Sequence, residues 1–357
     1  MGAAADSAEI AGGAGERAER AVLRALFALP APLRRRLAGR PVVRDGLELD
    51  ADTQLLLRLA ARDPPPSLRT LTPAQARTQL RRSTRLVAAR QAAVAEVRPL
   101  SVAGGAGPLP ARLYVPHEAP GSEGALVVCF HGGGWVVGDL DTHDVLCRGL
   151  ARSSGARVLS VGYRLAPEHP FPAGVEDALA SFRDAVARAG ELDADPRRVA
   201  VAGDSAGGHL ATVTARLAAA DEHPPAFQLL IYPVTVCLEV AASRLQFAEG
   251  FLLTKENMDF YEENFIGGAD RADPRISPLR ADTLSGLAPA MVVTAGFDPL
   301  RDEGEAYALR LRDDGVRTIL RRHPGYVHGF AHFMVGGSGP REAVAEMGGV
   351  LRGALAA

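Results

Sequence analysis

The sequence is poor in cysteine. Its 357 residues include three, Cys129, Cys147 and Cys237, which stand far apart in apolar surroundings. That arrangement offers neither a disulfide framework nor the close spacing of metal ligands. We therefore expect three packing residues in a reducing compartment, no metal site and a cytoplasmic protein.

The chain also lacks strong net charge and long apolar runs. Its formal charge is -2 at pH 7, and the arginines of the N-terminal region are interleaved with apolar and acidic residues, so a nucleic-acid partner is not indicated. No apolar run approaches the roughly 18 to 20 residues of a membrane span, and the N-terminus has no basic patch followed by a hydrophobic core. The sequence thus predicts no stable membrane insertion, and it leaves a homodimer open.

Hydrophobic residues make up 47% of the chain, enough for a large buried core. Residues 1–20 are small and acidic-polar, which predicts a disordered tail. Between 21 and 90, apolar residues recur at helical spacing, and Thr72-Pro73 is a typical helix start. We expect this segment to be a helical N-terminal cap, either packed on the core or lying over a pocket as a lid. Residues 91–357 then form the main domain, which includes a cap contribution from about 240–270.

Short apolar strands alternate with amphipathic helices in the main domain. A strand that is apolar throughout needs cover on both faces, so the pattern predicts an α/β fold with a mostly parallel central sheet flanked by helices. Residues Ala92 to Leu100 and Ala111 to Val115 alternate instead, which predicts an antiparallel pair at the sheet edge. The other expected strands are Ala125 to Phe130, Ala156 to Val161, Val199 to Ala202, Phe227 to Tyr232, Met291 to Ala295 and Thr318 to Arg321.

The most specific signal is GDSAGG from Gly203, which joins an apolar strand to a helix. Glycines two residues either side of Ser205 relieve crowding in a strained turn, and such a nucleophile elbow holds a serine oxygen clear of the sheet. The alternative is a glycine-rich turn in which the serine only caps the helix. The position between a clear strand and a clear helix favours the nucleophile.

A second glycine-rich turn, HGGGW from His131, follows another apolar strand. Without Cβ atoms, its backbone N–H groups can approach a ligand closely, as a developing oxyanion or a phosphate requires. A dinucleotide site is not supported, because Val137 stands where its spacing needs glycine or alanine. With a nucleophile nearby, we expect an oxyanion hole made by the amides of Gly133, Gly134 and Ala206.

A serine nucleophile needs a base, and the base needs an acid to orient it. In α/β-hydrolases these groups follow one another in the order serine, acid, histidine. That order favours His328, just after the last strand, with His332 as the fallback. Asp298 is the expected acid because it follows the preceding strand, although an Asp-Pro pair also caps helices. Asp302 is the competing candidate.

These motifs resemble the bacterial hormone-sensitive-lipase family of carboxylesterases, which have the α/β-hydrolase fold. The resemblance implies a catalytic domain with a triad of Ser205, Asp298 and His328, the oxyanion donors named above, and no cofactor. It also implies a helical cap whose second piece lies at Phe251 to Phe265. The match runs from about Ala92 to the C-terminus and rests on HGGGW from His131, YRLAPEHPFPA from Tyr163, GDSAGG from Gly203, DPLRDEG from Asp298 and HGF from His328.

The function that follows is a serine carboxylesterase, which hydrolyses small-molecule esters of short to medium acyl chain through an acyl-enzyme. Two alternatives stay open. One is a non-catalytic receptor for a small ligand on the same fold, and the other is hydrolysis of a lactone or an amide by the same residues.

Five further residues are expected near this site. Trp135, Leu252 and Met258 are candidate walls of the substrate pocket, with core packing as the alternative for the whole segment Phe251 to Phe265. We expect His131 to brace the glycine turn by hydrogen bonding and Asp204 to be structural, so that neither takes part in the chemistry.

Overall fold

A central sheet dominates the computed structural model, which describes residues 13–88, 91–117, 124–238, 241–333 and 337–356. Within these ranges the sheet has eight strands in the order β10-β9-β8-β7-β5-β6-β4-β3. Strand β4 is antiparallel to both of its neighbours, and the other neighbouring strands are parallel. The mostly parallel sheet with an antiparallel edge pair is therefore confirmed. The strands are β3 (Glu96–Gly104), β4 (Gly107–Val115), β5 (Gly124–Phe130), β6 (Arg157–Val161), β7 (Ala194–Asp204), β8 (Gln228–Ile231), β9 (Ala290–Phe297) and β10 (Thr318–Val327).

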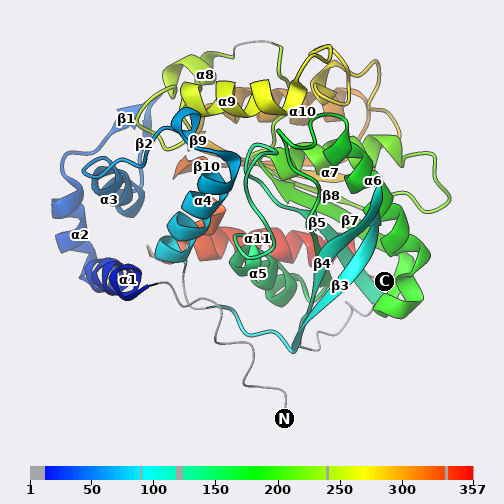
Figure 1. The fold of residues 1–357 in the computed structure, drawn as a ribbon, viewed down its shortest axis with the longest axis horizontal. Helices are drawn as coiled ribbons and strands as arrows, with labels where there is room; N and C mark the ends of the chain where they lie inside the picture. Colours follow the sequence, from blue (N-terminus) through cyan, green and yellow to red (C-terminus); the bar gives the residue numbers. More distant parts are fainter. Residues whose placement is uncertain (1–12, 89–90, 118–123, 239–240, 334–336, 357) are drawn as a thin grey trace.

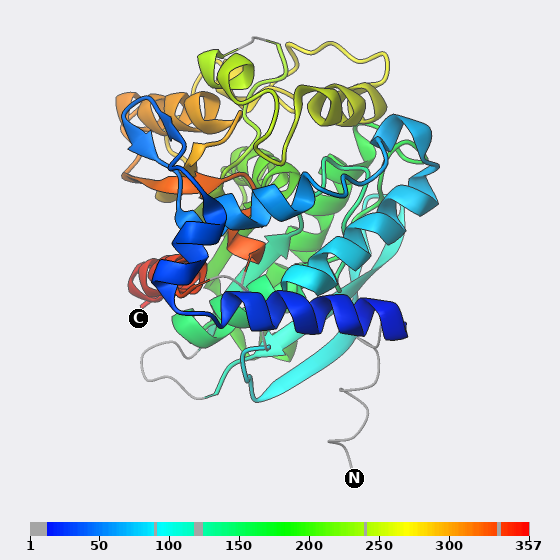
Figure 2. The same cartoon turned by 90° about the vertical axis from the view of Figure 1, so that its left-hand side faces the viewer.

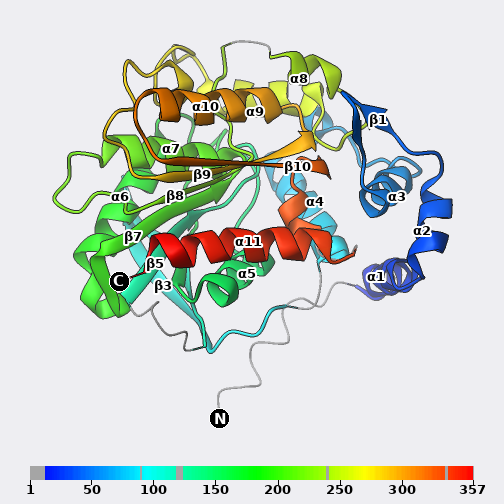
Figure 3. The same cartoon turned by 180° about the vertical axis from the view of Figure 1, so that it is seen from behind.

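Helices cover both faces of the sheet, as Figures 1 and 3 show from opposite sides. In β5, Leu126 and Val128 pack in the cluster that includes α6, α7 and α10, whereas Val127 and Cys129 pack in the cluster that includes α5 and α11. This alternation is why the strand is apolar throughout. The covering helices are α5 (Asp144–Ser154), α6 (Ala173–Ala187), α7 (Ala206–Leu217), α10 (Arg301–Asp313) and α11 (Gly339–Ala354).

The N-terminal segment lies along one flank of the molecule, which faces the viewer in Figure 2. Its first helix begins at Ala14, inside the range 1–20 for which we expected disorder, while residues 1–12 lie outside the described residues. Thr72 caps α4 as expected, in a reciprocal capping box with Gln75. The elements are α1 (Ala14–Phe27), α2 (Ala31–Ala38), β1 (Val43–Arg44), β2 (Leu47–Glu48), α3 (Ala51–Ala60), the 3-10 turn η1 (Leu68–Thr70) and α4 (Pro73–Val87).

A second helical piece follows β8 and contacts the N-terminal segment. It contains α8 (Ala242–Gln246) and α9 (Lys255–Ile266), and α9 starts with its own capping box at Thr254. Arg69 of η1 forms a bidentate ion pair with Glu263 of α9. The two pieces lie at the edge of the sheet where the parallel strands end (Figure 1). None of the helices in the described ranges combines the length and apolarity needed to cross a membrane.

Candidate active site

Ser205 lies at a sharp turn between β7 and α7. Its backbone has φ 55° and ψ -119°, a conformation that costs a non-glycine residue energy and is typical of a nucleophile elbow. The flanking glycines are needed because the backbone doubles back on itself and packs closely on the end of β5. A Cβ on Gly203 would lie 2.2 Å from the carbonyl oxygen of Gly207, and a Cβ on Gly207 would lie 2.0 Å from that of Phe130.

Ser205, His328 and Asp298 form one hydrogen-bonded line. His328 follows β10, and its Nε2 lies 2.9 Å from the Oγ of Ser205. Its Nδ1 lies 2.8 Å from Oδ2 of Asp298, whose side chain is fully buried. The buried carboxylate favours the tautomer with a proton on Nδ1, so Nε2 is left to accept the proton of the serine hydroxyl.

Asp298 contacts both the base and the start of a helix, whereas Asp302 contacts neither His328 nor Ser205 among the hydrogen bonds of the described residues. Helix α10 begins at Arg301 with Leu300 at the N-cap position, and Oδ1 of Asp298 accepts the N–H of Leu300 at 2.8 Å. Asp298 therefore orders the helix start with one oxygen and contacts His328 with the other. Asp302 lies in the first turn of α10, where its oxygens bind Arg301 and the N–H of Ser243.

At each glycine of the HGGGW turn, a neighbouring residue occupies the space where a Cβ would lie. A Cβ on Gly132 would lie 2.6 Å from Oδ2 of Asp204, and one on Gly133 would lie 2.2 Å from the carbonyl oxygen of Val137. Gly134 has φ +57°, and its added Cβ would lie 2.1 Å from Cγ of Tyr261 in α9. The turn is thus enclosed by the elbow on one side and by the second helical piece on the other.

Three amides at this site are free to bind a ligand. Within the part of the chain that the structure describes, the N–H groups of Gly133, Gly134 and Ala206 have no acceptor. The N–H of Ala206 belongs to the first residue of α7, where a helix leaves its amides unpaired. Unpaired amides beside a serine nucleophile can stabilise an oxyanion.

Comparison with known proteins agrees with this geometry. A family model described as the alpha/beta hydrolase fold matches residues 127–332. The chain belongs to the α/β-hydrolase family. The carboxylic ester hydrolase LipN of Mycobacterium tuberculosis is 44% identical over 337 residues, which are 92% of this chain and 89% of LipN. The ethyl acetate hydrolase of Pseudomonas putida is 44% identical over 226 residues, 62% of this chain and 71% of that protein.

Solved structures lead to the same family. An ester hydrolase from the metagenome of Lake Arreo, EH1AB1, solved in complex with a phosphonate derivative, has a TM-score of 0.82 and 42% identity. The match covers 85% of this chain and 98% of that one. The resemblance to the hormone-sensitive-lipase family is confirmed by these relatives.

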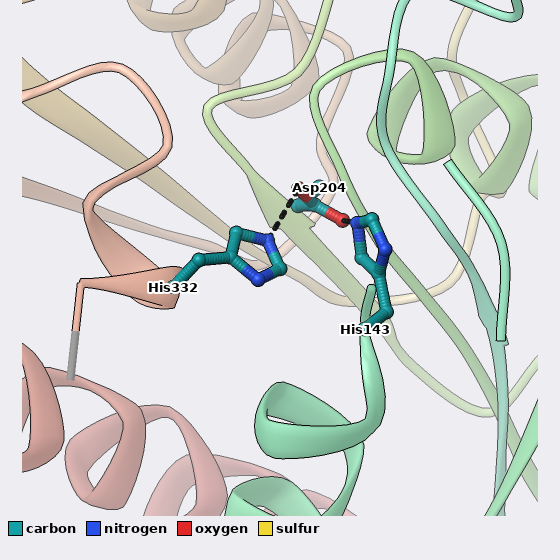
Figure 4. A group of neighbouring side chains, drawn as sticks. All are labelled: His143, Asp204 and His332. Atoms are coloured by element: carbon teal, nitrogen blue, oxygen red, sulfur yellow. Dashed lines mark hydrogen bonds and ion pairs between the residues drawn. The ribbon is translucent and has the colours of Figure 1, made fainter. Parts of the chain in front are cut away.

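Asp204, next to the serine of this α/β-hydrolase, joins three segments (Figure 4). Its Oδ1 accepts the N–H of Gly132 at 3.0 Å and lies 3.1 Å from Nε2 of His143, while its Oδ2 lies 3.0 Å from Nε2 of His332. Burial alone would raise the pKa of Asp204, but the two imidazoles hold it well below its usual value. The carboxylate thus fastens the glycine turn and the loop after His328 to the elbow.

The same three side chains could also hold a metal ion, because their ligand atoms lie within 4.8 Å of one another. The N–H of Gly132 already points at two of these atoms, with 2.9 Å to Nε2 of His143 and 3.0 Å to Oδ1 of Asp204. Hydrogen bonds therefore account for the cluster as it stands. His332, the fallback base, is engaged here and not with Ser205.

His131 braces the glycine turn as expected. Its Nδ1 lies 2.9 Å from the carbonyl oxygen of Gly132. The hydroxyl of Tyr163 donates to the carbonyl oxygen of His131 at 2.7 Å, and the two rings stack at 4.3 Å. Burial lowers the pKa of His131 to about 4, so the ring is neutral at physiological pH.

The candidate pocket residues occupy different environments. Trp135 is 3% exposed, stacks on Phe265 at 4.1 Å, and donates its indole N–H to Nδ1 of His209. Met258 is 6% exposed and packs in the main core cluster, whereas Leu252 is 46% exposed. Core packing therefore accounts for Trp135 and Met258, and a role for any of the three as a pocket wall stays a prediction.

The sequence does not predict four contacts at this site. Tyr261 lies against Gly134, His143 and His332 both contact Asp204, and Arg77 of α4 binds the backbone just after the glycine turn. Each contact joins positions at least 59 residues apart. No local pattern in a single sequence reports such pairs.

Proposed function

We propose that this α/β-hydrolase is a serine carboxylesterase, with Ser205 as nucleophile, His328 as base and Asp298 as the acid that orients it. The observation that carries the proposal is the continuous line from Ser205 Oγ to His328 Nε2 at 2.9 Å and from His328 Nδ1 to Asp298 Oδ2 at 2.8 Å. A nucleophile, a base within hydrogen-bond reach and a third group that orients the base are the requirements of covalent acyl transfer.

The reaction has two steps. In the first, His328 accepts the hydroxyl proton as Ser205 Oγ attacks the ester carbonyl, and the imidazolium then protonates the departing alcohol. In the second, His328 removes a proton from water as the water attacks the acyl-enzyme, and the imidazolium then returns that proton to Ser205 Oγ as the acid departs. Asp298 stays ionised and stabilises the imidazolium in both steps.

The amides of Gly133, Gly134 and Ala206 are the proposed oxyanion donors. They are unpaired within the described residues, so no hydrogen bond has to break before they bind the carbonyl oxygen. Loss of one such donor typically lowers turnover by about 100 to 1000-fold. Three donors on two rigid turns therefore supply a large part of the expected acceleration.

The expected substrates are small-molecule esters with short to medium acyl chains. The second helical piece reaches the glycine turn, where Tyr261 of α9 lies against Gly134, and a relative named ethyl acetate hydrolase supports a short acyl group. A receptor without activity is disfavoured because His328 and Asp298 are both in line with the serine. Lactone or amide hydrolysis by the same residues stays as the second candidate.

Location and partners are proposed from the sequence. The three cysteines are free and buried, which supports a reducing compartment such as the cytoplasm. We also propose that the protein has no nucleic-acid partner, since its net charge is -2. A homodimer stays a prediction.

Hydrolysis of aryl esters from acetate to palmitate by the purified protein tests the proposal. We expect activity that is highest for the shorter acyl groups, a loss of at least about 10,000-fold in Ser205→Ala, and no change in the control Ser285→Ala, whose serine is exposed. A phosphonate should label wild type at Ser205 and leave Ser205→Ala unlabelled. Equal hydrolysis by wild type and Ser205→Ala would contradict the mechanism, and a folded wild type inactive on every ester would favour a receptor.

A further inference from the structure

We propose that Arg77 of α4 is a positioning residue for the glycine turn, and that α4 is a fixed brace of the oxyanion hole rather than part of a free lid. This inference rests on the proposed function, because it assigns Arg77 to the same oxyanion hole. It concerns a residue about 60 positions away from the turn along the chain, in the segment that the family motifs do not cover.

The guanidinium of Arg77 binds three acceptors. Its Nε donates to the carbonyl oxygen of Val136 at 3.0 Å, and its Nη2 donates to that of Ala166 at 3.1 Å. The two terminal nitrogens also form a bidentate pair with the carboxylate of Glu168, at 2.9 and 2.6 Å. The planar fork of an arginine can satisfy such a set in one orientation, and a lysine cannot.

The two carbonyls belong to backbone that sets the shape of the glycine turn. Val136 directly follows Trp135, and the N–H groups of Val136 and Val137 both donate to the carbonyl oxygen of Gly133. The N–H of Ala166 donates to the carbonyl oxygen of Trp135 at 2.9 Å. Arg77 thus closes a small hydrogen-bonded unit whose other members orient the peptide group that joins Gly133 to Gly134 and therefore carries the N–H of Gly134.

Apolar packing holds α4 at the same place. Ala76, next to Arg77, is 1% exposed and packs in a cluster with Val136, Val137 and Ala166. The same cluster includes Tyr261 of α9, the ring that lies against Gly134. Movement of α4 away from the glycine turn would break four hydrogen bonds of Arg77 and expose this cluster to water. Both costs favour the position that α4 has in the structure.

The expected consequence is kinetic. Oxyanion donors act only when they lie about 3 Å from the position that the oxyanion will occupy. A small displacement of a donor therefore reduces the stabilisation of the transition state more than the binding of the substrate. Loss of Arg77 should therefore lower kcat and leave KM nearly unchanged. Phosphonylation of Ser205 should slow by a similar factor, because it also develops charge on an oxygen in the hole.

Arg69 provides a matched control. It lies in the same N-terminal segment and also forms a bidentate pair with a glutamate, Glu263, but its side chain and that of Glu263 are 42% and 55% exposed. Every hydrogen bond of Arg69 in the described residues goes to Glu263 or Ser67, away from the glycine turn. Arg69→Met therefore removes a contact between the two helical pieces without touching the turn.

The experiment compares wild type and Ser205→Ala with four variants, Arg77→Met, Arg77→Lys, Glu168→Gln and Arg69→Met. It measures kcat and KM on an aryl acetate, the rate of phosphonylation and the melting temperature of each protein. We expect Arg77→Met to lower kcat by about 10 to 100-fold with KM within about twofold, and Arg77→Lys to lie between it and wild type. Glu168→Gln should lose less than about threefold, because both carbonyls keep their donor. Arg69→Met should match wild type.

Three results would overturn the inference. One is a wild-type kcat in Arg77→Met while Ser205→Ala is inactive, which leaves the proposed function intact. Another is an equal fall of kcat in Arg69→Met and Arg77→Met, which would show general loosening of the segment. The third is equal activity of wild type and Ser205→Ala, which overturns the proposed function together with this inference. Arg77→Lys provides the comparison if Arg77→Met does not fold.

Discussion

The two glycine-rich turns that meet at Ser205 are built in different ways. In the elbow, Gly203 and Gly207 are needed because backbone packs on backbone, and Gly203 approaches a partner within its own five-residue motif. In the HGGGW turn, Gly133 also meets backbone, the carbonyl oxygen of Val137, but Gly134 is confined by the side chain of Tyr261 alone. The obstacles around the elbow are thus backbone, from the elbow itself and from β5, whereas the obstacle at Gly134 is a side chain from the distant helix α9.

This difference predicts how each turn responds to substitution. An obstacle made of buried backbone cannot be removed without moving a strand, so damage to the elbow should be severe and have no simple remedy. An obstacle made of a side chain can be removed by a second substitution. The following predictions test that contrast.

Gly207→Ala should have the largest effect. Its Cβ would lie 2.0 Å from the carbonyl oxygen of Phe130 in the buried strand β5, so the elbow and the strand must separate. We expect a loss of about 3 kcal/mol in the free energy of unfolding and no measurable ester hydrolysis, by urea denaturation and an aryl acetate assay. Gly353→Ala is the control, because it lies in a helix with no atom near the added Cβ. Near-wild-type activity in Gly207→Ala would remove the contrast.

Gly134→Ala should lower kcat by about 100-fold, because the new Cβ meets Tyr261 and displaces one oxyanion donor. The double variant Gly134→Ala with Tyr261→Ala should recover about tenfold, since the obstacle is gone and only the strain of φ +57° for alanine remains. Steady-state kinetics on the two single variants and the double variant give the coupling. A double variant no better than Gly134→Ala would show that this turn is as intolerant as the elbow.

His332→Phe should lower kcat by about tenfold, because it removes one of the three groups around Asp204 and loosens the loop that carries His328. His332→Gln should retain most of the rate, since its amide can donate to the carboxylate. Kinetics with melting temperatures for both variants separate positioning from stability. If the glutamine variant is as slow as the phenylalanine variant, the hydrogen bond to Asp204 is not what matters.

The smallest expected effect is a pH dependence of stability, which arises from one buried histidine near each turn. Burial lowers the pKa of His131 in the HGGGW turn to about 4, and burial also lowers the pKa of His209, four residues after Ser205, to about 4. The unfolded chain protonates these rings near pH 6.5, whereas the folded chain does not. Below that pH the unfolded chain therefore binds more protons than the folded chain. The free energy of unfolding falls as the pH falls from about 6.5 toward 4.

Between pH 7 and pH 6 each ring should account for a loss of about 0.7 kcal/mol in the free energy of unfolding. His131→Asn and His209→Asn keep a hydrogen-bonding group at each position and should each reduce the pH dependence by that amount. Urea denaturation at the two pH values measures it. An unchanged pH dependence in both variants would show that the rings titrate alike in the folded and unfolded chains.

Much of the fold and of the candidate site could be predicted from local patterns. The inner strands of the parallel sheet could be predicted because their buried stretches are apolar, and the elbow because glycine, serine and glycine stand between a strand and a helix. Strand ends were less accurate. Strand β10 runs to Val327, beyond the expected Arg321. The prediction stopped early because the last residues of the strand include polar side chains and Pro324 and form no apolar run.

The sequence alone determined the class of fold, the elbow at Ser205 and the order in which an acid and a histidine follow it, because these depend on residue type and spacing over a few positions. Only the tertiary structure decided which groups surround the HGGGW turn. Tyr261, Asp204 and Arg77 reach it from segments about 60 to 130 residues away, and side-chain contacts over such distances arise from packing, which no local pattern encodes.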